Sequence, residues 1–436
     1  MIYLDLLQLT YRNRRNIFLT KNDIKKLQQK KFMQLVHYVE QYSPYYKEII
    51  KKNHIDIANC KPEDFPVLTK AELLKHFDQI VTDRKITREK IEKFLEKSKN
   101  PEELFLNKYY VIHTSGSSGT ISYYVYSPKE LLAGASLATR ADGINFFQTL
   151  AYIAATEGHF AGVTMASITK KLPLLYKKVA IMDINAPFSN ILKKLNILQP
   201  DIVSGYAFAL RKIADAQQDK KINISPRLFL SGGEPLSKED KEYIQQTFHA
   251  PLINVYASSE HLYMGLGRDS FSGMYLMEDN LIFELHPTYT IITNLFNYTL
   301  PLIRYQMHDQ LAVINDTIRA MPFLKVKETF GRNEKVPIFY NDLGQEDFIN
   351  PIVLVEFFVK NVRQFQIQIL NKHSFIFKVI LEPHLSKQQR EDTLLKIKQE
   401  LFRILKEKLM TNVTFSIEEV AHLWADPQTG KFKLII

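Results

Sequence analysis

The N-terminal part of the chain carries apolar residues at helical spacing. Between residues 22 and 50 they recur every three or four positions, which predicts an amphipathic helix. These apolar residues are Leu27, Phe32, Leu35, Val36 and Val39. The helical pattern ends in Tyr-Ser-Pro-Tyr-Tyr, which predicts a turn. A second helix is expected from Thr69, because Glu72 stands three residues after this capping hydroxyl.

From residue 108 the pattern changes to β-branched and aromatic residues. The runs 109–112 and 123–126 predict two strands, and Gly116 and Gly119 interrupt the chain between them. A helix is then predicted from residue 128 to about residue 147. Its start is marked by an N-cap, a proline at the first helical position and a capping-box glutamate, which are Ser127, Pro128 and Glu130.

Short apolar runs alternate with helical patterns between residues 186 and 265. The expected helices are 188–198, 208–218 and 237–248, and the expected strands are 201–204, 228–230 and 252–256. This alternation predicts a parallel sheet, and ligands bind beyond the carboxyl ends of such strands. Small or polar residues follow each strand, so we expect three strand ends to face one crevice. These residues are Ser204-Gly205, Ser231 to Glu234 and Ala257 to Glu260.

The organisation changes again after residue 309, and the polar turn at 330–335 suits a domain boundary. Beyond it the pattern predicts strands at 365–370, 375–381 and 413–417 and a long amphipathic helix at 386–409. We therefore predict an α/β fold with two domains. The large N-terminal domain, residues 1–330, has mixed and parallel sheets flanked by helices, and residues 331–436 form a small, mobile α+β domain.

Composition supports a folded protein and excludes several classes. Among 436 residues, 45% are hydrophobic and 24% charged, which is enough apolar material for two cores. The single cysteine, Cys60, cannot form an intramolecular disulfide, and no Cys/His cluster has zinc spacing, so a reducing, cytoplasmic location is expected. The N-terminus lacks a cleavage site, and no segment has the length of a transmembrane helix.

The net charge of +10 comes from basic residues along the whole chain, with a dense spot at residues 25–31. We attribute it to solvated helix faces, although a basic surface can also attract nucleic acid, membrane lipid or an acidic carrier protein. No signature of a nucleic-acid-binding fold is present, so nucleic acid is not an expected partner.

The most specific segment is the glycine-rich loop His113 to Thr120, with the sequence His-Thr-Ser-Gly-Ser-Ser-Gly-Thr. Glycines let backbone amides turn inward and hydroxyls add donors, which together suit phosphate oxygens. It is not a Walker P-loop, because no Gly-Lys-Ser/Thr follows. By itself, such a loop is also compatible with an ordinary turn.

The loop belongs to an ordered series of motifs that resembles the adenylate-forming superfamily, specifically its branch of phenylacetate-coenzyme A ligases and CapK-type proteins. The series covers most of the chain. Besides the loop it comprises residues 43–46 (Ser-Pro-Tyr-Tyr), 65–70 (Phe-Pro-Val-Leu-Thr-Lys), 158–162 (Gly-His-Phe-Ala-Gly), 198–201 (Leu-Gln-Pro-Asp), 232–235 (Gly-Gly-Glu-Pro), 256–260 (Tyr-Ala-Ser-Ser-Glu), 301–305 (Pro-Leu-Ile-Arg-Tyr) with Asp309, and 331–332 (Gly-Arg).

The resemblance implies a nucleotide site made of several segments. Phosphates would be held by the loop residues Thr114, Ser115, Gly116, Ser117, Ser118 and Gly119. The adenine edge would contact Gly232, Gly233, Glu234 and Pro235, followed by Tyr256, Ala257, Ser258 and Ser259, with Tyr256 stacking on the base. Glu260 resembles the Mg²⁺ ligand, which suits a hard cation. Asp309 resembles the carboxylate that holds the ribose hydroxyls, and Arg332 the guanidinium near the same sugar. Alone, each would be a core, turn or capping residue.

Two further residues are candidates for catalysis. The segment 426–433 is similar to the family's final motif, in which a lysine after a glycine contacts the acid and phosphate. We assign Lys431 to this role, with Lys433 as the competitor and a solvated tail lysine as the alternative. His159 falls where the superfamily places aromatic residues beside the acyl pocket. It could polarise a carboxylate, or be a histidine satisfied inside the fold.

The implied activity is ATP- and Mg²⁺-dependent activation of a small aryl or acyl carboxylic acid to an acyl-adenylate, with release of pyrophosphate. The acyl group would then pass to a thiol acceptor, either coenzyme A or the phosphopantetheine of an acyl carrier protein. Alternatives are acyl transfer to an amine, adenylyl transfer to a hydroxyl as in related deazaflavin-coenzyme synthetases, or ligand binding without turnover. Homodimerisation is left open.

The sequence departs from the family pattern at several positions. Thr120 stands where many relatives have a lysine, Ala257 replaces a common glycine, Ala207 a frequent proline, and Asn333-Glu334 the usual acidic hinge pair. The expected acyl-pocket wall comprises residues 158–164, 206–208 and 261–264. It mixes aromatic, aliphatic and small residues, without a carboxylate placed to pair with an amino group, which disfavours an ordinary amino acid.

Overall fold

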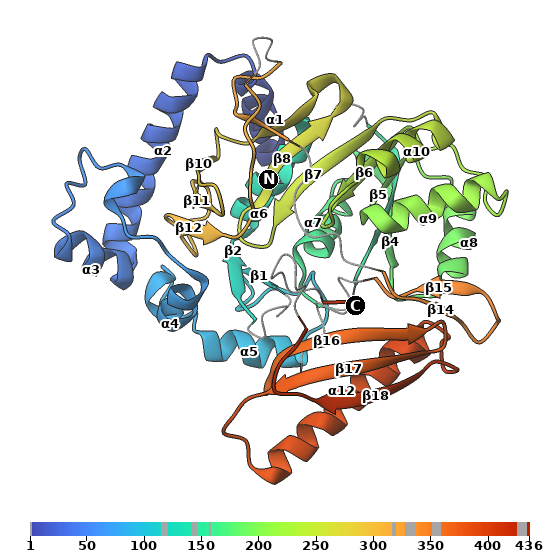
Figure 1. The fold of residues 1–436 in the computed structure, drawn as a ribbon. Coiled ribbons are helices and arrows are strands. Elements are labelled where there is room, and N and C mark those ends of the chain that lie inside the picture. Colours follow the sequence, from blue (N-terminus) through green and yellow to red (C-terminus); the bar gives the residue numbers. More distant parts are fainter. Residues whose placement is uncertain are drawn as a thin grey trace.

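The structure of the chain is a computed structural model. It describes residues 2–114, 121–140, 146–156, 158–315, 320–327, 336–350, 359–424 and 434–436. A larger N-terminal part (described residues 2–327) contains an eight-stranded sheet flanked by helices, and a smaller C-terminal part (described residues 336–436) lies beneath it (Figure 1). The predicted α/β fold class is confirmed. The predicted domain boundary at 330/331 lies outside the described residues.

Helices form one side of the N-terminal part. They are α1 (Ile2–Asn16), α2 (Lys21–Tyr42), α3 (Pro44–Lys52), η1 (Pro62–Asp64), α4 (Lys70–Ile80) and α5 (Arg88–Lys97). The helix predicted over 22–50 is divided at Ser43, whose side chain caps α3 ahead of Pro44 at the first helical position. The predicted Thr69 cap of α4 is confirmed, because its hydroxyl accepts from the Glu72 amide. Among the described residues, no helix is long and apolar enough to cross a membrane.

The eight-stranded sheet has the order β13-β9-β8-β7-β6-β5-β3-β4. Its strands are β3 (Gln148–Ala154), β4 (Tyr176–Asp183), β5 (Ile202–Gly205), β6 (Leu228–Gly232), β7 (Leu252–Ser258), β8 (Leu262–Arg268), β9 (Gly273–Leu276) and β13 (Lys325–Val326). Strands β4, β3, β5, β6 and β7 pair in parallel, and β8, β9 and β13 extend the sheet antiparallel. The carboxyl ends of β5, β6 and β7 therefore meet at one edge.

Helices connect the parallel strands, and all of them except α7 are predicted from the sequence. They are α7 (Ala161–Thr169), α8 (Phe188–Leu198), α9 (Ala207–Gln218) and α10 (Lys238–Phe248), with the short η3 (Asp269–Phe271) between β8 and β9. The alternation of strands and helices is confirmed at every predicted element between 188 and 258. Their buried apolar faces form one continuous core that also includes residues of the C-terminal part.

Two smaller sheets complete the N-terminal part. They are β1 (Tyr110–His113) with β2 (Tyr123–Tyr126), and β10 (Leu281–Leu285) with β11 (Thr290–Asn294) and β12 (Tyr305–Met307). β1 and β2 are the predicted strands on either side of the glycine-rich loop. The Thr114 amide donates to the Ser122 carbonyl at 2.9 Å, which closes the base of this loop.

The helix predicted over 128–147 is wrong at the described residues 136–140 and 146–147. It consists of α6 (Pro128–Ala135) and the short η2 (Ser136–Arg140), and Phe147 has a left-handed φ of 57°. The Asn13 side chain of α1 donates to the Ser136 carbonyl at 3.1 Å and to its hydroxyl at 2.9 Å. This tertiary contact takes a carbonyl that a continuing α-helix would use, and so overrides the local pattern.

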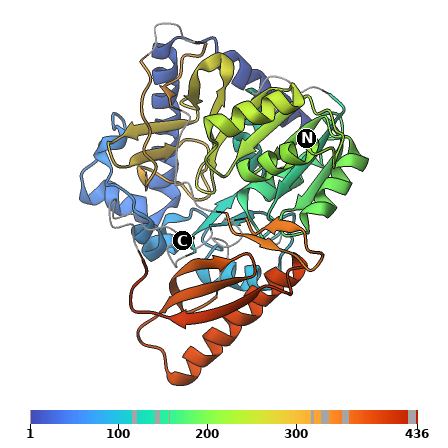
Figure 2. The same cartoon turned by 45° about the vertical axis from the view of Figure 1, so that its right-hand side comes forward.

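The C-terminal part contains β14 (Ile338–Tyr340), β15 (Glu346–Phe348), β16 (Val362–Asn371), β17 (Ser374–Leu381), α12 (Lys387–Glu407) and β18 (Thr414–Glu419). The predicted strands and helix are confirmed. Figure 2 shows α12 packed along the outer side of the β16-β17-β18 sheet. Asp347 joins the two parts, because its carboxylate accepts from the Phe188 amide at 2.8 Å and from buried Lys408 Nζ at 3.3 Å.

Candidate active site

A cavity of about 220 Å³ lies at the carboxyl ends of the central strands. Residues at the carboxyl ends of β5, β6 and β7 line it, as the sequence predicts, and these are Ser204, Gly205, Ser231, Gly232, Gly233, Ala257, Ser258 and Ser259. Gly233 has φ of 82°, a left-handed conformation that favours glycine and turns the backbone of this segment. The three predicted strand ends therefore share one concave site.

Aromatic residues also line the cavity. Phe160, Tyr206 and Tyr263 belong to the wall predicted from sequence, whereas Tyr152 of β3 and His113 of β1 do not. A Cβ on Gly162 would lie 2.0 Å from the Tyr152 hydroxyl, so the glycine is required for this tyrosine to reach the cavity. His261, which was also expected in the wall, is buried and absent from the lining.

Glu260 is held by tyrosines of the β1-β2 hairpin and β12. The Tyr124 hydroxyl donates to Glu260 Oε1 at 3.0 Å and lies 3.1 Å from the Tyr305 hydroxyl, while Tyr126 donates to the Glu260 carbonyl at 2.7 Å. Burial raises the pKa of Glu260, although hydrogen bonds and the positive charge of Lys70 act in the opposite direction. A dehydrated carboxylate beside a cation suits a site where charged ligands gather.

Glu260 could bind Mg²⁺ only together with a bound substrate that supplies further oxygen atoms. Among the described residues, no group of three or more His, Cys, Asp or Glu side chains could hold a metal ion. Mg²⁺ commonly takes one or two carboxylates and completes its shell with waters and substrate phosphates. Glu260 would be the protein ligand in such an arrangement.

Lys70 was not predicted as a site residue. It is the first residue of α4, and its positive charge interacts with Glu260. Burial lowers the pKa of Lys70, which the Glu260 charge partly offsets. The segment 65–70 was quoted from the sequence only for its resemblance, because nothing in its spacing indicates a contact with a residue 190 positions away.

Tyr256 and Asp309 are neighbours in space. The Tyr256 hydroxyl donates to Asp309 Oδ2 at 2.7 Å, and the Thr290 hydroxyl donates to the Asp309 carbonyl at 2.8 Å. The structure therefore brings together the residue expected at the adenine and the residue expected at the ribose. One hydrogen bond fixes the relative position of the ring and the carboxylate.

The Glu234 side chain has partners within the protein. Its carboxylate accepts from the Phe208 amide at 3.0 Å and from Asn350 Nδ2 at 2.8 Å, and burial raises its pKa. If residues 232–235 contact the adenine as predicted, they would therefore do so through their backbone, which includes Gly232 and Gly233. The carboxylate instead connects α9 and the C-terminal part to the cavity edge.

His159 and His113 take different positions. The His159 ring is buried against Phe94, with Nε2 3.2 Å from the Ser98 hydroxyl, and it does not line the cavity. This geometry favours the alternative that His159 is satisfied inside the fold. His113, which packs on Phe160, is the histidine at the cavity, and burial lowers its pKa to about 4, so the ring is neutral at neutral pH.

Several predicted residues lie outside the described residues, namely Ser115, Gly116, Ser117, Ser118, Gly119, Arg332 and Lys431, as does the competitor Lys433. The chain on either side of 425–433 is described, and both ends bond to β16. The buried Gln366 amide donates to the Trp424 carbonyl at 2.9 Å, and the Ile367 amide donates to the Leu434 carbonyl at 2.8 Å.

Buried histidines give a first testable prediction. Burial lowers the pKa of His113 and His159 to about 4 and that of His261 to about 3, whereas histidine in an unfolded chain titrates near 6.5. Below about pH 6.5 the unfolded state binds protons that the folded state does not. The free energy of unfolding should therefore decrease as the pH is lowered below about 6.5, by up to about 1.4 kcal/mol per pH unit for each histidine.

Urea denaturation at several pH values between 7.5 and 5 measures this slope. His261→Gln should reduce the slope by the equivalent of one proton, because its ring is buried and its Nε2 has no hydrogen-bond partner. An unchanged slope in this variant would contradict the assignment.

Comparison with known proteins agrees with the geometry. No protein-family model matches the sequence. Protein CapK of Staphylococcus aureus is 24% identical over 349 residues, which cover 72% of this chain and 68% of CapK. Among solved structures, 2-hydroxyisobutyryl-CoA ligase with 2-HIB-AMP and CoA in the thioesterification state matches with a TM-score of 0.60 and 14% identity, over 97% of this chain and 92% of that one. The same ligase in the postadenylation state with R3-HIB-AMP gives a TM-score of 0.59 and 16% identity, over 97% and 91%.

The chain therefore has the fold of the 2-hydroxyisobutyryl-CoA ligase structures, over both of its parts. Its sequence is similar to CapK, in agreement with the CapK-like resemblance inferred from the ordered motifs.

Proposed function

We propose that this protein uses ATP to convert a small carboxylic acid into an acyl-adenylate and then transfers the acyl group to a thiol. The observation that supports it best is the cavity at the ends of β5, β6 and β7, with Tyr256, bonded to Asp309, and Glu260 directly before and after its lining segment 257–259. These are the elements that a nucleotide and an acid need side by side. The 2-hydroxyisobutyryl-CoA ligase, whose fold this chain shares, has been seen in complex with 2-HIB-AMP and CoA, which supports the same reaction class.

In the first step a carboxylate oxygen of the acid attacks the α-phosphorus of ATP, and the bond to pyrophosphate breaks. Tyr256 and Asp309 would orient the adenosine, and Thr114 with the following loop would hold the phosphates. Mg²⁺ at Glu260 would supply positive charge to the phosphate oxygens. Lys431 would stabilise the developing negative charge between acid and phosphate, with Lys70 as a second cation on the Glu260 side.

In the second step the sulfur of a thiol attacks the acyl carbon and AMP leaves. Coenzyme A or the phosphopantetheine of a carrier protein would serve as the acceptor. The small domain would present this acceptor, which requires its contacts to the N-terminal part to change. Two hydrogen bonds connect the parts, one from Asn350 to Glu234 and one from the Phe188 amide to Asp347. Such a movement would either break these bonds or move both bonded residues together.

Pyrophosphate release tests the first step. The full chain is incubated with ATP, Mg²⁺ and a panel of aryl, fatty and amino acids, with Lys431→Ala as the inactive control and Lys433→Ala as its matched variant. We expect release with at least one acid and a strong loss only in Lys431→Ala. ATP binding without release for any acid would contradict the proposal. Coenzyme A, a carrier protein with phosphopantetheine, an amine and an alcohol, added in turn, then separate the acceptors.

The cavity lining favours a carboxylic acid whose acyl group carries no further charge and has one hydrogen-bonding substituent. None of the described lining residues is Asp, Glu, Lys or Arg, so nothing described there pairs with an amine or a second carboxylate. Ser231 is fully buried and its hydroxyl has no hydrogen-bond partner, although the residue lines the cavity. A buried hydroxyl is normally paired, so a polar group of the substrate is the expected partner.

Ser231→Ala should therefore discriminate between substrates. For an acid with a hydroxyl or carbonyl substituent, kcat/KM should fall by about 5- to 100-fold, the equivalent of roughly 1–3 kcal/mol for an unpaired buried group. For the unsubstituted acid of the same shape it should stay constant or rise. Thr164→Val is the matched control, because this buried hydroxyl also lacks a partner but does not line the cavity. Equal losses with both acids would contradict the assignment.

A further inference from the structure

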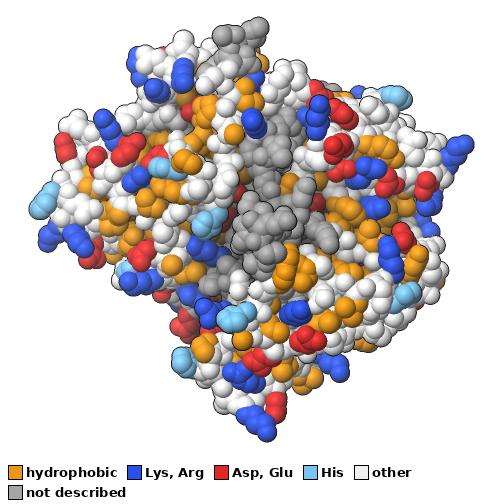
Figure 3. All heavy atoms as spheres, viewed as in Figure 1, with side chains coloured by type: hydrophobic (Ala, Val, Ile, Leu, Met, Phe, Trp, Pro, Cys, Tyr) orange, Lys and Arg blue, Asp and Glu red, His pale blue; other side chains and the backbone are white. Residues whose placement is uncertain are grey.

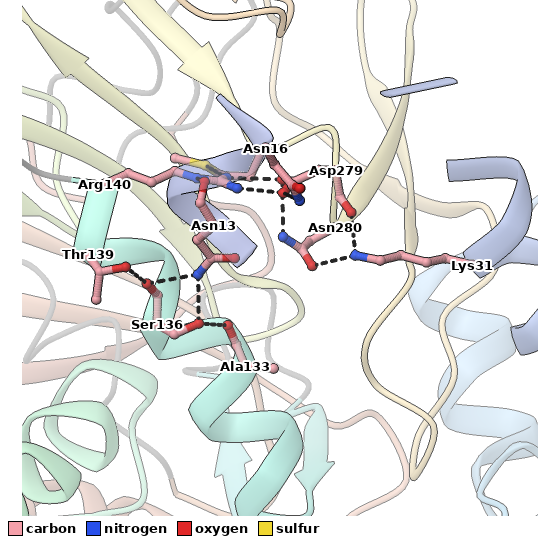
Figure 4. A network of polar contacts seen from close by, with 10 residues as sticks. Asn13, Asn16, Lys31, Ala133, Ser136, Thr139, Arg140, Asp279 and Asn280 are labelled. Carbon is pink, nitrogen blue, oxygen red and sulfur yellow. Dashed lines mark hydrogen bonds and ion pairs between the residues drawn. The ribbon is translucent and has the colours of Figure 1, made fainter. Parts of the chain in front are cut away.

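α1 is fastened to the rest of the protein by a buried polar network on one of its faces (Figure 4). Asn13 bonds to Ser136, and Asn16 donates to Asp279 Oδ2 at 2.7 Å. Arg140 donates to the same Asp279 carboxylate and to the Asn13 carbonyl. Lys31 of α2 donates to the Asp279 carbonyl at 2.6 Å and to the Asn280 side chain at 2.9 Å. Both helices are thus held in a fixed orientation relative to the sheet.

The opposite face of α1 exposes large apolar side chains. Leu4, Leu7 and Tyr11 are 66%, 62% and 70% exposed, and Phe18 in the turn before α2 is 83% exposed. Leu4, Leu7 and Tyr11 are three and four positions apart, so they share one side of the helix. Leu6 and Asn13, on the other side, are buried. Four exposed apolar residues on one short segment exceed what isolated surface residues explain.

Basic residues adjoin these apolar side chains. Arg14 and Arg15 are exposed at the end of α1, and Lys21, Lys25 and Lys26 are exposed at the beginning of α2. Residues 1–31 contain eight basic and two acidic residues, a net charge of +6 out of +10 for the whole chain. The charge is therefore concentrated here rather than spread evenly as the sequence first suggested. On the face shown in Figure 3, by contrast, basic and acidic side chains are interspersed.

We propose that this N-terminal face docks the protein on the surface of an anionic lipid membrane. It comprises Leu4, Leu7, Tyr11, Arg14, Arg15, Phe18, Lys21, Lys25 and Lys26. Apolar side chains that enter the acyl boundary, next to cations that attract lipid phosphates, are the combination by which an interfacial helix binds. A nucleic acid would use the cations but leave the exposed leucines in water. An acidic carrier protein would likewise use the charge without requiring apolar side chains along a convex helix.

The position of the face is compatible with this role. In Figures 1 and 2, α1 and the beginning of α2 lie at the end of the molecule away from the C-terminal part. Docking there leaves the C-terminal part and the strand ends that line the cavity away from the lipid. The buried network around Asp279 also means that α1 is already folded and oriented before it meets a membrane, so little ordering is required on binding.

Co-sedimentation of the full chain with vesicles tests the proposal. Vesicles of phosphatidylcholine alone are compared with vesicles containing about 30% phosphatidylglycerol, at low and at physiological salt. We expect binding to the anionic vesicles that is at least about tenfold stronger and weakens with salt. Leu7→Ser/Tyr11→Ser and Arg14→Glu/Arg15→Glu should each reduce this binding by about tenfold or more, with unchanged thermal unfolding.

Two matched variants carry the same changes elsewhere. Ile197→Ser removes an apolar residue that is 84% exposed on α8, and Lys220→Glu/Lys221→Glu reverses a second basic pair. Neither should alter vesicle binding. Equal binding by all variants would overturn the proposal, as would equal binding to neutral vesicles. Sensitivity to the charge reversal alone, with stronger binding to DNA, would indicate a polyanion site instead. Loss of a dimer in Leu7→Ser/Tyr11→Ser would indicate a subunit interface.

Discussion

Replacement of Glu260 by glutamine is expected to reduce pyrophosphate release by a factor on the order of 10²–10³ without unfolding the protein. The carboxylate is held in place by Tyr124 and lies beside the charge of Lys70, and glutamine preserves its shape and its ability to accept from the tyrosine. What the substitution removes is the negative charge that would hold Mg²⁺ at the phosphates. Steady-state pyrophosphate assays at several Mg²⁺ concentrations measure the effect.

The Mg²⁺ dependence separates this explanation from a structural one. In Glu260→Gln the Mg²⁺ concentration required for half-maximal rate should rise, while thermal unfolding stays near that of the parent protein. Glu284→Gln is a matched control, because this carboxylate is paired with Arg304 and no described contact connects it with the cavity. A Glu260→Gln enzyme with unchanged rate and unchanged Mg²⁺ dependence would remove Glu260 from the proposed site.

Replacement of Asp279 by asparagine is expected to lower the free energy of unfolding by about 3–5 kcal/mol, since it leaves a buried guanidinium without its partner. The Arg140 and Asp279 side chains are both fully buried and form a two-pronged ion pair. Although burial opposes it, the charge of Arg140 keeps the pKa of Asp279 below its ordinary value, so the carboxylate is ionised at neutral pH. Urea denaturation followed by circular dichroism measures the loss.

Two further variants make this second prediction specific. Glu89→Gln breaks an exposed ion pair with Lys93 on α5 and should leave the free energy of unfolding nearly unchanged, because water screens this pair. Arg140→Met combined with Asp279→Asn removes the unpaired charge and should recover part of the lost stability. A loss below about 1 kcal/mol for Asp279→Asn alone would show that the network does not stabilise the N-terminal helices.

Elements with a regular apolar period were predicted correctly from the sequence. The parallel strands and helices between 188 and 258 follow from alternating short apolar runs and amphipathic stretches, because each buries one face in a common core. Their order, with small residues after each strand, was sufficient to expect one shared crevice. The helix over 128–147 failed because Asn13, more than 120 positions earlier, binds Ser136. Local spacing contains no information about such a partner.

The same limit applies to the candidate site. The family resemblance indicated Glu260, Tyr256 and Asp309, and the structure has Tyr256 and Glu260 directly before and after the lining segment 257–259, with Asp309 bonded to Tyr256. Sequence spacing could not show which of His113 and His159 faces the cavity, since that depends on how β1 and the turn before α7 are oriented. Nor could it show that Lys70 approaches Glu260, because the position of α4 depends on the pairing of Leu68, just before the helix, with Tyr305 of β12.

The single cysteine has a practical consequence. Cys60 is buried and burial raises the pKa of its thiol, so it reacts slowly with thiol reagents in the folded state. A cysteine introduced at an exposed position would then be the one fast-reacting thiol in the chain. Placed at Phe18 or, for comparison, at Ile197, it would carry a fluorophore or spin label whose environment reports how deeply each position enters a lipid bilayer. The wild-type background can therefore serve directly for site-specific spectroscopy.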